Sequence, residues 1–241
     1  MWGVSSDRVA VVDCEGNGTT AGVRRTFTCV TTRQGMDSNE VRRQWAERSG
    51  EYSPEYYAYR GPDHVSEALY SILDRFVGRE AAVLELGCSA GRHLAHLHER
   101  GFENLAGIEV NGEAFEGMAD TYPEVAAAGT FHEGAIEDLV GEVEDGAFDA
   151  VYSVETLQHV HRDAEWTFAE LARITDDLLV TVENEGDGEP RRDDPEVNYV
   201  HGDFPLYYRD WRGVFTDLGF DEVEAREGDR DTIRVFRKPD A

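Results

Sequence analysis

The sequence has 241 residues, of which 50 are acidic and 23 basic, so the formal net charge is −27. This charge argues against a nucleic-acid partner, because no basic stripe is available to neutralise phosphates. No run of about 18 apolar residues occurs, so we expect no transmembrane helix and no membrane partner. The three cysteines, Cys14, Cys29 and Cys88, fit neither a disulfide framework nor a zinc pattern, and they predict a reducing, cytoplasmic location.

The acidic residues lie within an otherwise ordinary composition. Hydrophobic residues make up 40% of the chain, which indicates one substantial core and not a disordered acidic tail. Lysine occurs once, as Lys238, and all other basic residues are arginine. Acid in every segment with almost no lysine resembles the proteins of salt-loving organisms with a saline cytoplasm, and we interpret the composition as halophilic. The alternative is simply an acidic protein.

Residues 1–35 differ from the rest of the chain. They hold four arginines against three acids, which leaves 47 acidic and 19 basic residues in 36–241, a net charge of −28. Met36 would also make a natural start. We therefore expect residues 1–35 to be a disordered N-terminal extension and residues 36–241 to form a single domain.

The segment between Met36 and residue 80 predicts helices. Ser38 can cap a helix that runs to about Arg48, with Trp45 on its apolar face. A tyrosine-rich stretch follows over residues 52–59, and then a helix that should pack on a sheet. The tyrosine-rich stretch is either a lid over a ligand or plain packing at the sheet edge.

The stretch from Val83 to Val110 is the centre of the predicted fold. It reads as a buried strand, a turn with Gly87 and Gly91, a helix, and a second buried strand that ends at Glu109. The helix N-terminus faces the glycine turn, which suits a polar ligand group. In parallel sheets, ligands bind at the carboxyl ends of such strands.

Two cofactor classes use this arrangement. A dinucleotide fold has the spacing Gly-x-Gly-x-x-Gly, but here Ser89 replaces the middle glycine and Glu85 would repel a pyrophosphate. Glu85 suits a cationic ligand instead. The stretch therefore resembles motif I of the class I S-adenosylmethionine (SAM) dependent methyltransferases, and Glu109 matches the ribose-binding acid of that family. The alternative is that both glutamates merely cap strand ends.

Later segments strengthen the resemblance, which covers about residues 38–238. Residues 148–160 resemble the fourth strand of the family and its Leu-x-His-Val finish, and residues 134–139 resemble its adenine-binding turn. Residues 221–227 and 232–236 predict a terminal hairpin. The resemblance implies a single-domain α/β fold: a doubly wound, Rossmann-like sheet of seven mostly parallel strands, in the order 3-2-1-4-5-7-6, with an antiparallel last strand.

The resemblance implies SAM as cofactor and methyl transfer by in-line displacement to a small-molecule acceptor. The residues expected to bind the cofactor are Glu85, Gly87, Cys88, Ser89, Gly91, Glu109, Val110, Ala135, Ile136, Glu137 and Ser153. The residues expected to bind the acceptor are Tyr59, Glu155, Glu183, Asn184 and His201. His159 is the candidate catalytic base, and the alternative is a histidine that only supports its loop.

Other interpretations remain at this point. No metal site is predicted, because His93, His96 and His98 lack a convergent fourth ligand and are expected to face solvent. The rival functions are an NAD(P)-dependent oxidoreductase of Rossmann type and a non-catalytic binding protein on the SAM fold. The sequence leaves the acceptor molecule, the acceptor atom and the oligomeric state open.

Overall fold

The structure is a computed structural model, which describes residues 36–186, 197–200 and 204–239. Residues 36–241 form one compact unit. The N-terminal extension expected over residues 1–35 lies outside the described residues. None of the helices in the described part of the chain has both the length and the apolar character that crossing a bilayer requires.

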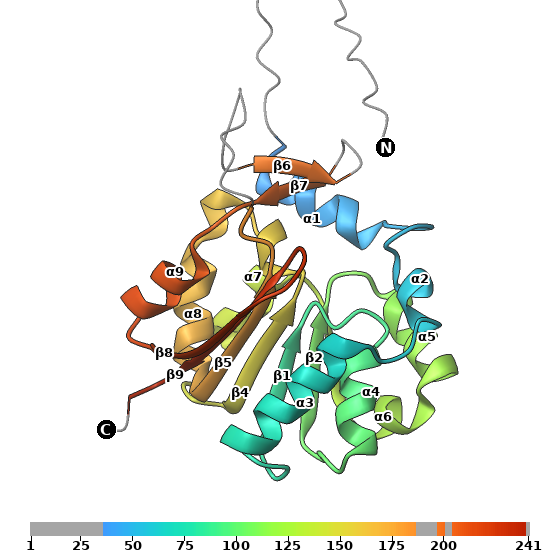
Figure 1. Ribbon diagram of the computed structural model, residues 1–241. Helices are drawn as coiled ribbons and strands as arrows, with labels where there is room; N and C mark the ends of the chain where they lie inside the picture. Colours follow the sequence, from blue (N-terminus) through green and yellow to red (C-terminus); the bar gives the residue numbers. More distant parts are fainter. Residues whose placement is uncertain (1–35, 187–196, 201–203, 240–241) are drawn as a thin grey trace, which may run out of the picture. The chain divides into compact units, whose positions relative to one another are not determined.

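A seven-stranded sheet forms the centre of this unit (Figure 1). Its order is β3-β2-β1-β4-β5-β9-β8, which confirms the predicted topology. The first five strands are parallel, and β9 runs antiparallel to both of its neighbours. The strands span β1 Val83–Leu86, β2 Leu105–Glu109, β3 Thr130–Glu133, β4 Phe148–Val154, β5 Thr175–Glu183, β8 Asp221–Glu227 and β9 Thr232–Arg237.

Helices cover both faces of the sheet, because successive residues of the central strands are apolar on opposite sides. Val83 of β1 packs with one layer and Leu84 with the other. The first layer contains α3 His64–Phe76, α4 Arg92–Glu99, α5 Glu113–Thr121 and α6 Pro123–Ala128. The second contains α7 Ile136–Leu139, α8 Trp166–Ile174 and α9 Trp211–Asp217, with the short helices η1 Val140–Glu142 and η3 Arg162–Ala164.

Four further elements lie near the carboxyl ends of the strands. These are α1 Ser38–Ala46, α2 Pro54–Ala58, the short helix η2 Leu157–His159, and a separate two-stranded sheet of β6 Val197–Val200 and β7 Phe204–Tyr207. Figure 1 shows α1 beside β6 and β7 at one end of the main sheet. The sequence predicted α1 but neither α2 nor the β6–β7 pair.

Two local expectations are wrong. Asp37, and not Ser38, caps α1, since its carboxylate accepts the Glu40 N–H at 2.9 Å. The histidines of α4 do not all face solvent: His93 and His96 are buried. His93 Nδ1 lies 2.8 Å from Ser66 Oγ, and His96 is hydrogen-bonded to α3 through Glu67. These two histidines therefore join α4 to α3.

Candidate functional site

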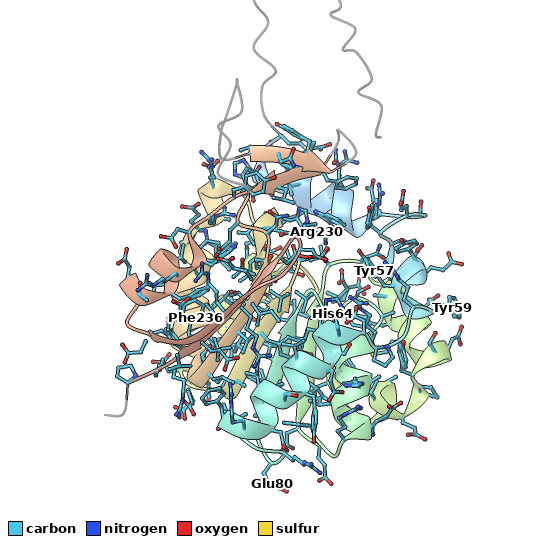
Figure 2. All side chains as sticks on the ribbon, in the orientation of Figure 1. Tyr57, Tyr59, His64, Glu80, Arg230 and Phe236 are labelled. Carbon is cyan, nitrogen blue, oxygen red and sulfur yellow. The ribbon has the colours of Figure 1, made fainter. Side chains whose placement is uncertain are left out.

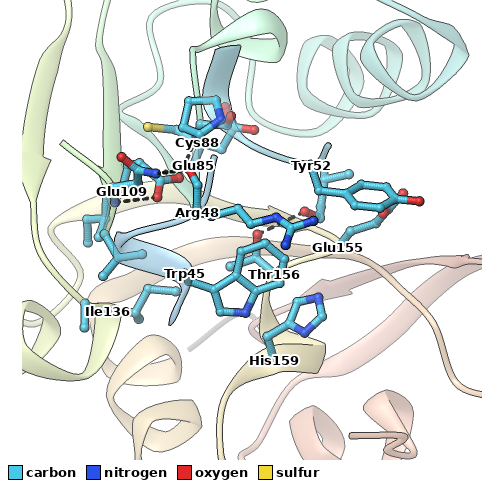
Figure 3. A pocket seen from close by; sticks show the side chains of 18 of the residues that line it. Trp45, Arg48, Tyr52, Glu85, Cys88, Glu109, Ile136, Glu155, Thr156 and His159 are labelled. Atoms are coloured by element: carbon cyan, nitrogen blue, oxygen red, sulfur yellow. Dashed lines mark hydrogen bonds between the residues drawn. The ribbon is translucent and has the colours of Figure 1, made fainter. Parts of the chain in front are cut away.

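A pocket lies at the carboxyl ends of β1, β2 and β4 (Figure 3). Its floor comes from the turns that follow these strands, and its cover comes from α1, the segment around α2, β7 and the β8–β9 turn. The floor is continuous in sequence with the central strands, whereas the cover joins segments from both ends of the described chain. This is the position at which doubly wound sheets bind ligands.

The glycine turn after β1 forms the middle of the floor. Gly87 and Gly91 have positive φ angles of 66° and 77°, and Ser89 adopts 48°. A Cβ atom at Gly87 would overlap the Thr156 side chain, so the turn requires glycine both for its conformation and for this close approach. Gly91 caps the N-terminus of α4 and does not itself line the pocket.

Glu109 ties the turn to the end of β2. One carboxylate oxygen accepts the Ser89 N–H at 2.9 Å, and the other accepts the Asn111 N–H at 2.8 Å. Burial raises the pKa of Glu109, while these backbone hydrogen bonds oppose the rise. Each oxygen retains a second lone pair, so Glu109 can still accept from a ligand hydroxyl.

Glu85 is a buried carboxyl group, with only 2% of its surface exposed. It accepts a hydrogen bond from the Tyr152 hydroxyl at 3.0 Å, and burial raises its pKa to about 8. Within the described residues, no basic side chain forms an ion pair with it. A buried carboxyl group without a cation is a site that a positively charged ligand group would complete.

The turn after β3 supplies an apolar wall. Ala135 and Ile136 are buried and line the pocket, together with Glu137 and Val110. Cys88 is also buried at the pocket, where its sulfur packs against Gly107 of β2. The predicted cofactor residues Glu85, Gly87, Cys88, Ser89, Glu109, Val110, Ala135, Ile136 and Glu137 thus line one pocket.

His159 and Glu155 lie on the side of the pocket formed by the turn after β4. His159 Nδ1 is 2.9 Å from the Pro205 carbonyl oxygen, and a carbonyl can only accept, so Nδ1 carries the proton. Burial lowers the pKa of His159 to about 4, which keeps the ring neutral with an unprotonated Nε2. Glu155 has a positive φ of 49° and is ion-paired with Arg230 of the β8–β9 turn.

The cover is held together by aromatic contacts. The Trp45 ring lies 4.6 Å from that of His159 and 4.8 Å from that of Phe204. The Arg48 guanidinium lies 4.6 Å from the Phe204 ring centroid, and Figure 3 shows its side chain extending across the pocket. Its Nε donates to the Glu51 carbonyl at 2.7 Å, and no carboxylate pairs with it in the part of the chain that the structure describes.

Besides Gly91, four described residues that were predicted for the site do not line the pocket. Glu183 is fully buried below it, where its carboxylate accepts from Ser153 Oγ at 2.7 Å and from the backbone N–H groups of Thr156, Leu157 and Gln158. Ser153 and Glu183 therefore hold the loop that carries His159. Asn184 also stays outside the lining, and its N–H donates to Gln158. Tyr59 is 77% exposed and points outward (Figure 2), and His201 lies outside the described residues.

Sequence reasoning did not assign several pocket residues. Four of them, Arg48, Asn111, Leu206 and Arg230, lie in no motif. Arg48, Leu206 and Arg230 reach the pocket from segments far from the glycine turn. Trp45 and Tyr57 were visible only as aromatic residues of the N-terminal segment. The periodicity of α1 places Trp45 on an apolar face, which was the one available signal.

Comparison with known proteins identifies the central part of the chain. Residues 83–177 match the family described as "Methyltransferase domain". The O-antigen chain terminator bifunctional methyltransferase/kinase WbdD of Escherichia coli is 31% identical over 94 residues, which are 38% of this chain. The match spans only 13% of the length of that much longer protein.

Solved structures share the fold. The magnesium protoporphyrin IX methyltransferase ChlM from Synechocystis, solved with SAM, superposes with a TM-score of 0.62 at 16% identity, over 86% of this chain and all of that one. The 1,6-didemethyltoxoflavin-N1-methyltransferase of Burkholderia thailandensis, solved with S-adenosylhomocysteine, gives 0.58 at 20% identity, over 73% and 79%. Residues 83–177 thus match a methyltransferase domain, and the sheet order and these two structures show that the chain has the fold of SAM-dependent methyltransferases.

Proposed function

We propose that this protein transfers the methyl group of SAM to a small-molecule acceptor. The observation that carries the proposal is the pairing of Glu85 and Glu109, two carboxylates at the ends of adjacent parallel strands, around the Ser89 turn of one pocket. A cofactor with a positively charged amino acid end and a ribose matches both carboxylates. A dinucleotide pyrophosphate would instead meet Glu85, which disfavours the NAD(P) alternative.

The charges on both sides of the pocket fit the amino acid end of SAM. Glu85 would accept from the ammonium group, which would complete its buried carboxylate. Arg48 would donate to the carboxylate, because its guanidinium lies in the pocket and has no acidic partner in the described residues. A negative and a positive side chain in one pocket can thus recognise a zwitterion.

The adenosine end fits the remaining floor. Glu109 would accept from the ribose hydroxyls with its second lone pairs while it keeps the Ser89 turn in place. Ala135 and Ile136 would cover the adenine ring, and Glu137 lies beside them. Gly87 leaves room for a ligand to approach the main chain.

SAM supplies an activated methyl group on a sulfonium, so the chain's residues need mainly to orient the acceptor and exclude water. Trp45, Phe204 and His159 would exclude water from above, since their rings pack together over the pocket. With a pKa of about 4, His159 is too weak a base to take a proton from an alcohol. Its Nε2 can instead accept a hydrogen bond and orient the acceptor.

The acceptor is proposed to be small because the acidic charge of the chain disfavours a polyanion. With a net charge of −27, the protein would repel a nucleic acid except at high salt. The second rival, a SAM-binding protein without catalysis, shares the same cofactor geometry and can be separated only by turnover.

Calorimetry on the full chain would test the cofactor, with SAM, S-adenosylhomocysteine and NAD as ligands. We expect binding of the first two and none of NAD; binding of NAD without SAM would contradict the proposal. Methyl-labelled SAM would then be incubated with small metabolites, nucleic acids or proteins. Label in the small-molecule fraction is expected. SAM binding without any labelled product would favour the non-catalytic alternative.

A further inference from the structure

The acceptor side of the pocket contains an ion pair that is unrelated to the cofactor residues. Arg230, from the turn between β8 and β9, reaches the Glu155 carboxylate at the end of β4. Both side chains line the pocket. The two residues are 75 positions apart in the sequence, and Figure 2 shows Arg230 over the same end of the sheet as Tyr57. The Arg230 guanidinium therefore already binds the Glu155 carboxylate within the pocket.

The charge around this ion pair is not balanced. Asp231 also pairs with Arg230, at 3.2 Å, and lies against the Glu155 carboxyl group. One Asp231 carboxylate oxygen is buried and has no hydrogen-bond partner in the described residues. Two carboxyl groups thus share one guanidinium, and the group keeps an unused, buried hydrogen-bond acceptor.

His159 supplies a second and independent acceptor on the same side. His159 donates its Nδ1–H to the Pro205 carbonyl, so Nε2 carries the lone pair that can accept a hydrogen bond. Nε2 lies 3.5 Å from the Gln158 side-chain nitrogen, which is the outer limit of a hydrogen bond. The polar groups on this side can therefore accept hydrogen bonds and balance a positive charge. The aromatic rings of Trp45, Tyr52 and Tyr57 line the same pocket.

From this geometry we infer that the methyl acceptor is an amine, which binds as its ammonium ion to Glu155 in the place that the Arg230 guanidinium occupies. The inference rests on the proposed methyl transfer and names its acceptor class. Arg230 would move aside with the β8–β9 turn, on which it is 56% exposed. His159 Nε2 would accept from a second N–H and fix the orientation of the nitrogen.

The reaction balances with these groups. The bound ammonium first gives one proton to the Glu155–Asp231 pair through Glu155, the member that lines the pocket. Burial raises the pKa of Asp231 to about 6, which supports a proton on the pair. The nitrogen lone pair then forms the N–C bond, while the electrons of the C–S bond remain on sulfur. The methylated amine leaves as a cation, and the carboxyl proton passes to solvent.

Titration of the full chain saturated with S-adenosylhomocysteine tests the inference. The probes are benzylamine, benzyl alcohol and benzoate, which have similar shape but carry positive, no and negative charge at pH 7. We expect benzylamine to bind at least about tenfold more tightly than benzyl alcohol. Equal affinities, or a preference for benzoate, would overturn the inference, the latter because Arg230 would then be receiving an anion.

Three variants sharpen the test. Arg230→Gln should strengthen benzylamine binding several-fold, because it frees Glu155, and Glu155→Gln should remove the preference over benzyl alcohol. Arg226→Gln is the matched control: Arg226 lies on the same hairpin and pairs with Glu224, outside the pocket lining. Melting curves identify a variant that fails to fold. If Arg230→Gln weakens benzylamine binding in a folded protein, the amine does not bind Glu155 in the place of the Arg230 guanidinium, and the inference is wrong.

The titration also separates the two proposals. If S-adenosylhomocysteine does not bind, the proposed methyl transfer fails. If it binds and the amine preference is absent, only the acceptor class is wrong.

Discussion

The floor and the cover of the pocket are built in different ways. The floor uses short turns directly after β1, β2 and β4, with the apolar wall after β3. Glu85 is buried against the Tyr152 hydroxyl, and Glu109 is held by two backbone N–H groups. The cover joins α1, β7 and the β8–β9 turn, which meet through single side chains such as Trp45 and Phe204. The floor is therefore fixed by the sheet, whereas the cover depends on contacts between segments that are distant in sequence.

This difference assigns separate tasks to the two regions. A rigid floor suits the cofactor, since the same ligand must bind in the same position at each turnover. A cover made of a few aromatic contacts and one ion pair can open for an acceptor to enter. Changes in the floor should therefore affect cofactor affinity strongly, and changes in the cover should affect it weakly.

The largest effect is expected at Gly87. Gly87→Ala forces a positive φ on alanine and drives its Cβ into Thr156, so we expect at least about 100-fold weaker S-adenosylhomocysteine binding and a lower melting temperature. Gly141→Ala is the control, because Gly141 has no heavy atom within 4 Å of its added Cβ and no positive φ. Unchanged affinity in calorimetry of Gly87→Ala would show that the floor is not rigid.

Glu109 is expected to come next. Glu109→Ala removes the ligand contact and the two bonds that hold the Ser89 and Asn111 backbone, which should weaken SAM binding by about 1.5–3 kcal/mol, or about 10- to 150-fold. Glu137→Ala, on the neighbouring turn, should cost much less because Glu137 holds no backbone group in the described residues. Equal losses of SAM affinity for the two variants in calorimetry would show that Glu109 contributes no more to cofactor binding than Glu137 does.

The floor was also the region that the sequence predicted well. A strand, a glycine turn and an acid at the next strand end follow each other within 27 residues, so local spacing indicates their joint position. The predicted sheet order is confirmed for the same reason. Glu183 shows the limit of this reasoning: it was expected near the acceptor because it ends β5, but the loop that carries His159 folds back and takes all of its hydrogen bonds.

The cover could not be predicted from local spacing. Arg230 follows a hairpin pattern that indicates a turn, but nothing in that pattern tells which carboxylate the turn reaches. Tyr59 was predicted to bind the acceptor from a stretch with several tyrosines. In the structure Tyr57 on α2 faces the pocket, whereas Tyr59, just after this helix, is exposed. Contacts between remote segments depend on the whole fold.

A third prediction uses the pH dependence of the floor. Since the pKa of Glu85 is raised to about 8, the free protein carries a proton on this carboxyl group at pH 6, and the ammonium group of SAM must replace it. Affinity should therefore rise by up to about tenfold per pH unit between 6 and 8 and then level off, with release of a proton on binding.

Calorimetry in buffers of different ionisation enthalpy measures that proton. The control ligand is 5′-methylthioadenosine, which lacks the amino acid end and should bind with little pH dependence over the same range. Glu85→Gln should likewise flatten the response to SAM. Parallel pH curves for SAM and the control ligand would show that Glu85 does not meet the ammonium group.

The cover should give a smaller effect. Trp45→Ala removes the ring that packs on His159 and Phe204, and we expect about 3- to 10-fold weaker S-adenosylhomocysteine binding, about 0.7–1.4 kcal/mol. Trp166→Ala is the matched control, since Trp166 is 52% exposed and does not line the pocket. A loss as large as that of Gly87→Ala would mean that the cover belongs to the rigid part of the site.

The smallest effect on cofactor affinity is expected from salt. Salt should change the stability of the acidic protein but hardly change binding at the buried floor of the pocket. Residues 36–241 carry a net charge of −28, and exposed ion pairs such as Arg43–Glu47 and Arg79–Asp74 offset little of the resulting repulsion. Potassium chloride should raise the melting temperature, by about 2–4 °C for each kcal/mol of repulsion that it screens. Because the Debye length falls to about 3 Å at 1 M, the rise in melting temperature from screening should level off near that concentration. A rise caused by exclusion of salt from the protein surface would continue.

The contacts of Glu85 and Glu109 are buried and screened much less, so S-adenosylhomocysteine affinity should change less than about twofold over the same range. A flat melting temperature would contradict the halophilic interpretation, and a cofactor affinity that followed the melting temperature would show that the floor is as exposed to the solvent's ions as the surface is.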